Sequence, residues 1–309
     1  MLFSKSAVPF DQEKDIPPLD GKVILVTGCT NGLGKQSVLE YCRHSPKEVW
    51  LAARDPERAR VAADEIRAQV PGAPIKLLEV DLESFDSIKA AAKKFMEESV
   101  RLDILLLNAG IMAPPPGLTR DGYEVQFGTN HMGHALLTKL LLPVLEKTAA
   151  LPGADVRVVA VASYGHNRVP KEGILFDTLK TPAADIGPYQ RYGQSKLANL
   201  LFIRQLAKEY PQFTAAVVHP GLVKTNLAGA ATGSGFLISA LWKVMQYSLT
   251  TVEDGVRNQL WASISKDVKS GEYYEPVGVA GKASVHGRND EFAKRVWDWT
   301  EEELVKHGA

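Results

Sequence analysis

Six short runs of hydrophobic residues recur along the chain, separated by segments long enough to form helices. They cover residues 22–28 (KVILVTG), 48–54 (EVWLAAR), 75–81 (IKLLEVD), 102–110 (LDILLLNAG), 156–163 (VRVVAVAS) and 213–221 (FTAAVVHPG). Within each run the apolar residues are nearly continuous, which is typical of parallel strands covered on both faces. The pattern therefore predicts an α/β fold: a single doubly wound parallel sheet with helices on both faces.

The intervening segments carry helix signals, and none of them divides the chain. Asp55, Pro56 and Glu57 offer an N-cap, a proline at the first helical position and an acid in the first turn. No repeat, low-complexity tract or long linker is present. We expect an extended N-terminal arm (residues 1–20) and one domain (residues 21–309), with irregular excursions near residues 164–188 and 222–250.

Composition and charge restrict the class of protein. Lys and Arg (36) balance Asp and Glu (36), which does not fit a nucleic-acid-binding protein, so we expect a small-molecule partner. Two cysteines, Cys29 and Cys42, are too few for a disulfide framework or a metal cluster. The N-terminus has no apolar signal region, and the longest uncharged run, residues 225–242, is interrupted by glycines. We expect a cytoplasmic protein without a transmembrane helix.

The first hydrophobic run leads directly into a glycine-rich loop, TGCTNGLGK (residues 27–35). Its glycines, at positions 28, 32 and 34, stand between a strand and the start of a predicted helix. Such a loop lets the backbone approach a pyrophosphate at a helix N-terminus, where free N–H groups and the helix dipole favour an anion. The spacing differs from the commoner G-x-G-x-x-G fingerprint, and a purely structural turn is the alternative. The loop indicates a dinucleotide site.

The end of the second run bears on the choice between the two nicotinamide cofactors. In dinucleotide-binding folds an acid at this point holds the ribose 2′-hydroxyl, whereas an Arg accommodates a 2′-phosphate. Here the strand ends in Ala53 and Arg54, and Asp55 before Pro56 is better explained as the helix cap. We expect NADP(H) as the preferred cofactor, with NAD(H) as the alternative.

Tyr192 and Lys196 occur one helical turn apart in RYGQSKLANLLF (residues 191–202). At this spacing both side chains lie on one helix face, and a cation beside a phenol favours the phenolate. The alternative interpretation is a surface tyrosine and a solvated lysine. Other motifs of the chain decide between the two.

Taken together, the motifs resemble those of the short-chain dehydrogenase/reductases, and the match covers nearly the whole chain. TGCTNGLG is similar to the TGxxxGxG loop of that family, residues 108–110 to its NAG motif, and HPG at 219–221, with Thr225, to its cofactor-closing segment. The catalytic tetrad of the family is matched, in order, by Asn130, Ser163, Tyr192 and Lys196. VASYGH and VVHPGLVKT are most similar to the branch of the retinol dehydrogenases and WW-domain oxidoreductases.

The resemblance implies a Rossmann fold and a hydride transfer that interconverts a carbonyl and an alcohol. It implies that Tyr192 is the acid and base, that Ser163 binds the substrate oxygen, and that Lys196 tunes Tyr192 and holds the nicotinamide ribose. Asn130 would bend its helix, which Gly128 and Gly133 interrupt, and hold a water that links Lys196 to solvent. The other residues implied to contact the cofactor are Gly28, Asn31, Gly32, Leu33, Gly34, Arg54, Asp81, Leu82, Asn108, Ala109, Gly110, Pro220, Gly221, Val223 and Thr225.

The two excursions suggest the kind of substrate. Ser163 and Tyr192 lie 29 positions apart, more than is usual in the family, and the surplus is the excursion at 164–188. The second excursion contains the apolar stretch FLISALWKVMQYS (residues 236–248). Loops often carry specificity on such scaffolds, so we expect a fairly large, mostly apolar ketone, aldehyde or alcohol. The alternative is packing in the core or against a second subunit, which leaves a homodimer open; peripheral membrane contact is not favoured, because Lys243 is the one cation of that stretch.

Two further points follow from the sequence. His131, His134, His166 and His219 are scattered and lack the tight spacing of a metal site, so no metal is expected. The alternative function is a cofactor-binding regulator or scaffold with little turnover. Such a protein would not need the Tyr192–Lys196 pair.

Overall fold

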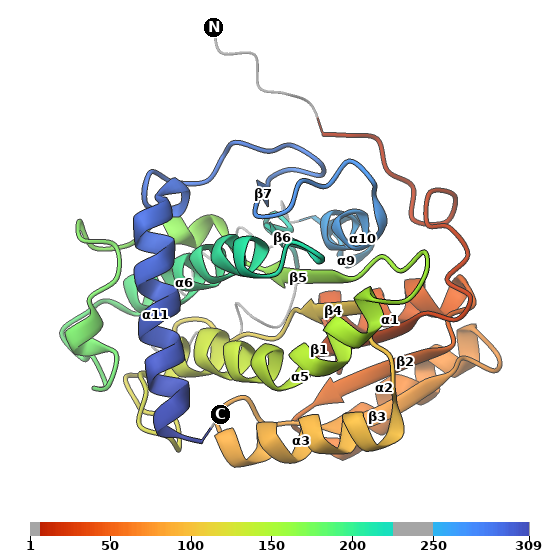
Figure 1. Cartoon of the computed structure of the whole chain (residues 1–309), viewed down its shortest axis with the longest axis horizontal. Coiled ribbons are helices and arrows are strands. Elements are labelled where there is room, and N and C mark those ends of the chain that lie inside the picture. Colours follow the sequence, from red (N-terminus) through yellow and green to blue (C-terminus); the bar gives the residue numbers. More distant parts are fainter. Residues whose placement is uncertain (1–6, 225–249, 309) are drawn as a thin grey trace, which may run out of the picture.

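The computed structural model describes residues 7–224 and 250–308. In these ranges seven parallel strands form one sheet in the order β3-β2-β1-β4-β5-β6-β7 (Figure 1). The strands are β1 (Val23–Thr27), β2 (Glu48–Ala53), β3 (Ile75–Glu79), β4 (Ile104–Leu107), β5 (Arg157–Val161), β6 (Thr214–Val218) and β7 (Tyr273–Tyr274). All six predicted strands are present. The pattern did not predict β7, because two residues are too few to form a hydrophobic run.

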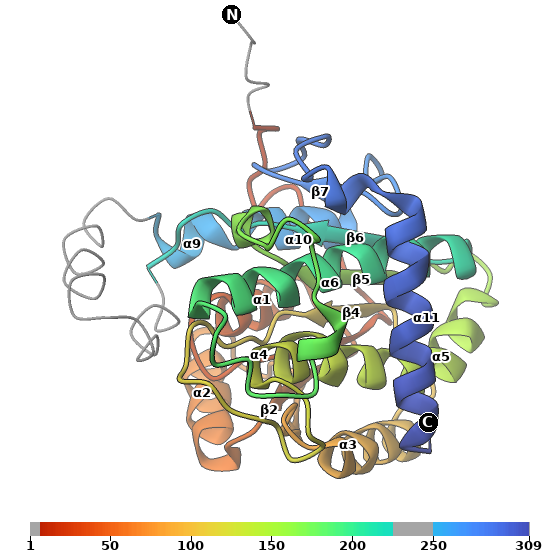
Figure 2. The same ribbon diagram turned by 90° about the vertical axis from the view of Figure 1, so that its left-hand side faces the viewer.

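Helices connect and cover the strands. The longer ones are α1 (Gly32–Arg43), α2 (Pro56–Gln69), α3 (Phe85–Glu98), α5 (Gly133–Ala149), α6 (Pro188–Glu209), α10 (Arg257–Ile264) and α11 (Asp290–Lys306). The shorter ones are α4 (Val125–Phe127), the π-helical η1 (Gly128–Met132), η2 (Tyr164–Asn167), η3 (Phe176–Thr178), α9 (Val252–Gly255) and η5 (His286–Arg288). α11 packs on α6, as Figure 2 shows.

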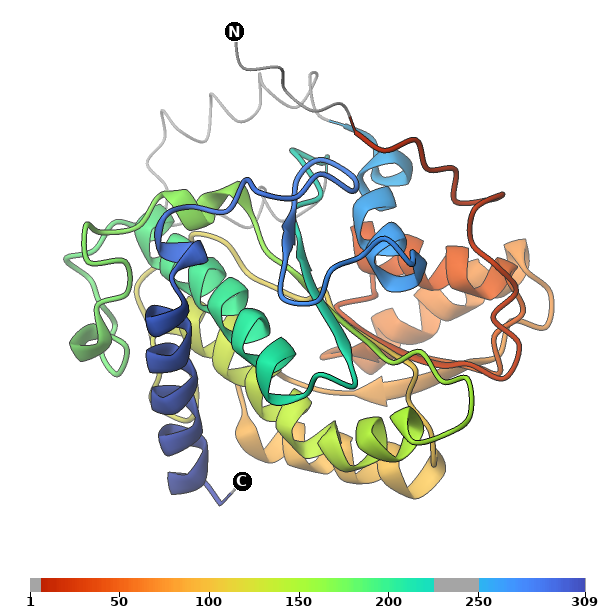
Figure 3. The same cartoon turned by 45° about the horizontal axis from the view of Figure 1, so that its top comes forward.

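Neighbouring residues of one strand point into two different cores. In β1, Val23 and Leu25 belong to a core shared with α3, α5, α6 and α11. Ile24 and Val26 belong to a second core shared with α1, α2 and α10. Figure 3 shows the two groups of helices on opposite sides of the sheet. Because both faces are covered, Val23–Val26 are all apolar, and the doubly wound fold is confirmed.

Over residues 7–20 the N-terminal arm contains no helix or strand and packs on the domain. Phe10, Ile16 and Leu19 are buried. The N–H of Val8 donates to the carbonyl of Val277 at 2.9 Å, and the N–H of Leu19 donates to the carbonyl of His44 at 2.7 Å. The arm therefore contributes side chains to the core beside α1 and α10.

The strand order reverses between β1 and β4, which are neighbours in the sheet but not in the chain. Ligands bind doubly wound sheets in the crevice outside the carboxyl ends of the strands at such a point. The excursion at 164–188 contains η2 and η3, whereas most of the excursion at 222–250 lies outside the described residues. Within the described ranges no helix is both long and apolar enough to cross a membrane.

Candidate active site

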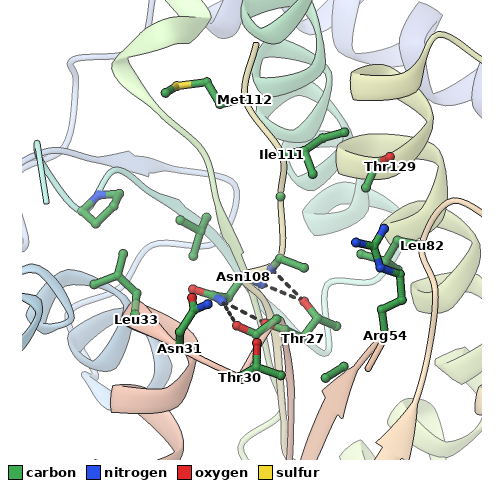
Figure 4. Close-up of a pocket in the computed structure, with 18 of the residues that line it drawn as sticks. Thr27, Thr30, Asn31, Leu33, Arg54, Leu82, Asn108, Ile111, Met112 and Thr129 are labelled. Atoms are coloured by element: carbon green, nitrogen blue, oxygen red, sulfur yellow. Dashed lines mark hydrogen bonds between the residues drawn. The ribbon is translucent and has the colours of Figure 1, made fainter. Parts of the chain in front are cut away.

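A cavity of about 860 Å³ opens at the carboxyl ends of the strands (Figure 4). Its volume falls in the range of small-molecule and cofactor sites. The predicted residues that line it are Gly28, Asn31, Gly32, Leu33, Gly34, Arg54, Asp81, Leu82, Asn108, Ala109, Gly110, Ser163, Tyr192, Lys196, Pro220, Gly221 and Val223. Asn130 does not line the cavity, and Thr225 lies outside the described residues.

The glycine-rich loop forms a cradle that a side chain would fill. Gly28 has a φ of +72°, in the left-handed region that favours glycine. A Cβ on Gly34 would lie 2.3 Å from the carbonyl oxygen of Gly28. Asn31, the N-cap of α1, makes no side-chain capping hydrogen bond, so its side chain does not occupy the N–H groups that open the helix. The loop fits a pyrophosphate at the start of α1.

Thr27, which the sequence analysis missed, joins this loop to the NAG segment. Its Oγ1 accepts hydrogen bonds from the backbone N–H groups of Asn108 and Ala109, both at 3.0 Å (Figure 4). The Asn108 amide donates in turn to the carbonyl of Thr27 at 2.8 Å. The sequence feature that could have pointed to Thr27 is its position directly before Gly28, the first glycine of the loop. Only the pairing of β1 with β4 shows what it contacts.

Two basic residues line the cavity near the carboxyl end of β2: Arg54, which follows the strand, and Arg58 in α2. Arg54 is 68% exposed and pairs with Glu83, with 3.3 Å between Nη1 and Oε1. Arg58, in the first turn of α2, lines the same cavity and was not predicted. The Asp55 carboxylate accepts from the backbone N–H groups of Glu57 and Arg58, at 3.0 and 3.1 Å. The structure thus confirms Asp55 as the cap of α2.

The four tetrad residues come from three different parts of the fold. Tyr192 and Lys196 lie on α6 and are buried, which rules out the interpretation as a surface pair. Lys196 Nζ lies 5.7 Å from the centre of the Tyr192 ring and donates to the carbonyl of Val161, at the end of β5, at 2.9 Å. Ser163 follows β5, and its Oγ accepts from the N–H of Gly165 at 3.0 Å. Tyr192, Lys196 and Ser163 share the cavity wall.

Burial dominates the protonation of the Tyr192–Lys196 pair. It raises the pKa of Tyr192 to about 12, although the Ser163 hydroxyl acts in the opposite direction. It also lowers the pKa of Lys196 to about 8. Burial raises the pKa of Tyr192 because it removes the charged form from water. The effect of Lys196 on the phenol stays a prediction.

Asn130 occupies the middle of the π-helical turn η1, between Gly128 and Gly133, where the sequence indicated a bend. Its side-chain amide donates to the carbonyl of Ile111 at 3.0 Å and to Ser195 Oγ at 2.9 Å. Its Oδ1 accepts from the N–H of Ile111 at 2.8 Å. The side chain of Asn130 therefore anchors the segment after β4.

Three of the four histidines that the sequence analysis considered form hydrogen bonds with other groups of the protein. His131 bonds Thr300 at 2.9 Å, His134 bonds Thr27 at 2.9 Å, and His166 bonds the carbonyl of Ser163 at 2.7 Å. His219 lines the cavity without having been predicted there. In residues 7–224 and 250–308 no three His, Cys, Asp or Glu side chains form a metal-binding group.

Comparison with known proteins identifies the family of this chain. The family model for short chain dehydrogenases matches residues 22–173. Short-chain dehydrogenase/reductase drtF of Aspergillus calidoustus is 41% identical, over 97% of this chain and 98% of its own length. The chain belongs to the short-chain dehydrogenase/reductase family. The predicted family and enzyme class are confirmed.

Other relatives of this short-chain dehydrogenase/reductase support the predicted branch. Retinol dehydrogenase 12 of Mus musculus is 35% identical over 91% of this chain and 85% of its own length. Retinol dehydrogenase 13 of Homo sapiens is 34% identical over 90% of this chain and 83% of its own length. The enzyme therefore uses a nicotinamide cofactor, as the family does.

Solved structures show the same fold. A protein from Mycobacterium paratuberculosis has a TM-score of 0.73 at 29% identity, covering 95% of this chain and 97% of its own. A short chain dehydrogenase from Shigella flexneri, solved in complex with NADP, has a TM-score of 0.64 at 21% identity, covering 83% and 97%. The sheet of this short-chain dehydrogenase/reductase is a Rossmann fold.

The residues on the substrate side of the cavity agree only in part with the predicted excursions. The described lining contains no residue of 164–188, although Ser163 and Tyr192 flank that excursion. The described walls beyond the catalytic residues include Ile111 and Met112, which the sequence analysis missed, and Leu222, which belongs to the predicted excursion at 222–250. The signal for Ile111 and Met112 was their place directly after NAG. The apolar stretch 236–248 lies outside the described residues.

Proposed function

We propose that this enzyme interconverts a carbonyl and an alcohol on a fairly large, mostly apolar small molecule, with NADP(H) as its preferred cofactor. The observation that carries the proposal is one cavity that holds both the glycine cradle and the side chains of Ser163, Tyr192 and Lys196. A protein that only binds the cofactor would have no use for a buried tyrosine and lysine on that wall. Turnover is therefore favoured over a regulatory or scaffold role.

The chemistry divides between cofactor and protein. Bound NADPH supplies a hydride to the carbonyl carbon of the substrate. Tyr192 donates its phenolic proton to the carbonyl oxygen, and Ser163 donates a hydrogen bond to the same oxygen. Since burial raises the pKa of Tyr192 to about 12, the phenol is protonated at neutral pH, as reduction requires. The oxidation direction needs the phenolate, which a protonated Lys196 stabilises.

The preference for NADP(H) is supported by charge at the end of β2. Arg54 and Arg58 line the cavity where the ribose of the adenosine would lie, and a guanidinium matches a 2′-phosphate. Asp55, the acid that follows the strand, is committed to two backbone N–H groups of α2. Asp55 is therefore not a free acid that could hold the ribose 2′-hydroxyl of NAD(H).

An apolar substrate is supported by apolar residues in the lining of the cavity that holds Tyr192. Ile111, Met112 and Leu222 offer apolar surface, and burying such surface contributes about 25 cal/mol per Å². Relatives named as retinol dehydrogenases agree with a large apolar alcohol or aldehyde. We propose that residues 164–188 and 222–250 contribute to specificity, and that the protein is cytoplasmic, in keeping with its two unpaired cysteines. A homodimer is compatible with the proposal.

The test is a panel of ketones, aldehydes and alcohols of increasing size, with NADPH and NADH, followed by absorbance of the reduced nicotinamide. We expect turnover that rises with the apolar size of the substrate and is greater with NADPH. Cofactor binding without turnover of any compound would support the regulatory alternative.

A further inference from the structure

A buried ion pair stands one residue away from the catalytic tyrosine. Arg191 precedes Tyr192 on α6, and its guanidinium lies 3.1 Å from Glu124; the two side chains are 2% and 3% exposed. Arg191 also donates to the carbonyls of Pro114 and Ile186, each at 3.2 Å. Its contacts with Glu124 and Pro114 join segments distant in the sequence.

The carboxylate is fully engaged as well. Glu124 Oε2 accepts from the N–H groups of Gln126 and Phe127, at 3.0 and 2.7 Å, and so caps α4. α4 continues into η1, which carries Asn130. A buried ion pair is weak evidence for stability, because apolar residues of similar volume often serve as well. Its position next to the site calls for another explanation.

The segment Ile111–Pro114 is held by hydrogen bonds with Arg191 and with two side chains close to Glu124 in the sequence. Both backbone groups of Ile111 bond the Asn130 amide, as described above. The N–H of Ala113 donates to Gln126 Oε1 at 2.9 Å, and the carbonyl of Pro114 accepts from Arg191. Ala113 has a φ of +51°, a left-handed conformation that this network maintains.

This segment faces the cavity. Ile111 and Met112 line it, and Figure 4 shows them beyond the Thr27–Asn108 junction, away from the glycine loop. The substrate wall is therefore tied at one end to Asn130 and at the other to the residue next to Tyr192. A shift of this wall changes the shape of the cavity that holds Tyr192.

We propose that the Arg191–Glu124 pair is a positioning device that fixes Ile111–Pro114 as the substrate wall, so that Met112 selects substrates by size. The choice of substrate rests on the proposed function, whereas the positioning of the wall does not. A purely structural ion pair would affect stability alone. A positioning pair affects substrate binding and the order of this segment.

The decisive variants are Arg191→Met and the double variant Arg191→Met/Glu124→Gln. The single change leaves a buried carboxylate without its cation and costs stability. The double change removes both charges, and an amide oxygen at position 124 still caps α4. Arg157→Met is the matched control: Arg157 is 5% exposed and bonds Asp155 and the carbonyl of Ser265, at the amino end of β5 and far from the cavity.

We expect the double variant to raise KM for nonanal at least about fivefold while the Kd of NADPH changes less than about twofold, the signature of lost substrate positioning. The amides of Ile111 and Ala113 should exchange hydrogen faster, and Arg157→Met should change neither readout. Met112→Ala should raise kcat/KM for 2-acetylnaphthalene relative to acetophenone by about threefold or more, because a methionine side chain no longer limits the space.

An unchanged KM in the double variant overturns the proposal, even if exchange becomes faster. An equal rise of KM in Arg157→Met overturns it too, since the effect would then follow from stability. If the unmodified enzyme reduces no carbonyl compound, the proposed function fails separately. The Kd of 1-nonanol in the presence of NADPH then replaces KM: a rise in the double variant alone supports the device, and no rise refutes it.

Discussion

Tyr192 and Lys196 share one face of α6, and both side chains are withdrawn from water. Their spacing places the ammonium 5.7 Å from the ring centre, but the surroundings decide how each group titrates. Burial favours the neutral form of both, so the pKa of the phenol rises and the pKa of the lysine falls. The protonation states of these two residues therefore depend on their burial.

Tyr192→Phe should lower kcat by at least about 10²-fold, because general acid catalysis typically contributes that much. The change removes one hydroxyl and keeps the ring, so the Kd of NADPH should stay nearly constant. Tyr164→Phe, at an exposed tyrosine beside Ser163, is the control and should retain activity. If the Tyr192→Phe variant kept more than about a tenth of the normal kcat, another group would have to donate the proton.

Lys196 should make stability depend on pH. Its pKa is about 8 in the folded protein and 10.5 in the reference state, so the unfolded chain binds more protons between these values. Stability from this group therefore rises with pH across that window, and its cost is fully present below pH 8. Relative to Lys196→Met, the cofactor-free protein should gain about 2 kcal/mol between about pH 7 and 10, measured by urea unfolding. A constant difference between the two proteins would contradict the shift.

Arg54→Ala should weaken NADPH binding by at least about tenfold and NADH binding by less than about twofold, because only NADPH loses a phosphate partner. Fluorescence titration with each cofactor measures both. Glu83→Gln is the control, since it removes the acid that pairs with Arg54 and should not weaken NADPH. Equal losses with both cofactors would remove the basis for the NADP(H) preference.

At the scale of elements, the ends of helices organise the site. α1 begins at the glycine cradle with its Asn31 side chain uncommitted to capping, whereas α2 begins with a fully engaged Asp55. A π-helical turn between α4 and α5 aims the Asn130 side chain at Ile111. Similar polar residues at helix starts thus serve either a ligand or the fold, depending on whether their side chains already have partners.

Asp55→Ala should therefore cost about 1 kcal/mol of stability, the usual contribution of an N-cap. The ratio of NADPH to NADH affinity should not change, because the carboxylate serves two backbone N–H groups of α2. Asp64→Ala, at a largely exposed acid of the same helix, is the control for stability. An increased NADPH preference in Asp55→Ala would restore the alternative that this acid binds the ribose.

At the scale of the whole molecule, the sheet gathers residues from β1, β2 and β5, from the segment after β4 and from α6 onto one cavity. The described apolar wall comes from Ile111 and Met112 after β4, which the sequence analysis did not single out, and from Leu222 after β6, which lies in a predicted excursion. The apolar stretch at 236–248 remains a second candidate wall on its composition.

Replacing residues 236–247 by a short Gly/Ser loop should raise KM for lipophilic substrates, because less apolar surface would be buried on binding. NADPH affinity should be retained, since the replacement changes neither the glycine loop nor Arg54. Steady-state kinetics with short and long aldehydes, together with the oligomeric state by light scattering, checks this. Unfolding or dissociation of an oligomer with unchanged KM would show that the stretch is structural.

The sequence by itself determined the six longer strands, the glycine loop and the placement of Tyr192 and Lys196 on one helix face, because these depend on local patterns: continuous apolar runs, glycine spacing and a helical repeat. It also identified Asp55 as a cap, since a cap is recognised within four residues. Only the tertiary structure decided that Thr27, Arg58 and Met112 belong to the cavity and that Arg191 reaches Glu124. It also decided that Tyr192 and Lys196 are buried, which raises the pKa of the phenol and lowers the pKa of the lysine. Contacts between distant segments and the exclusion of water exist only once the chain is packed, and no local pattern encodes them.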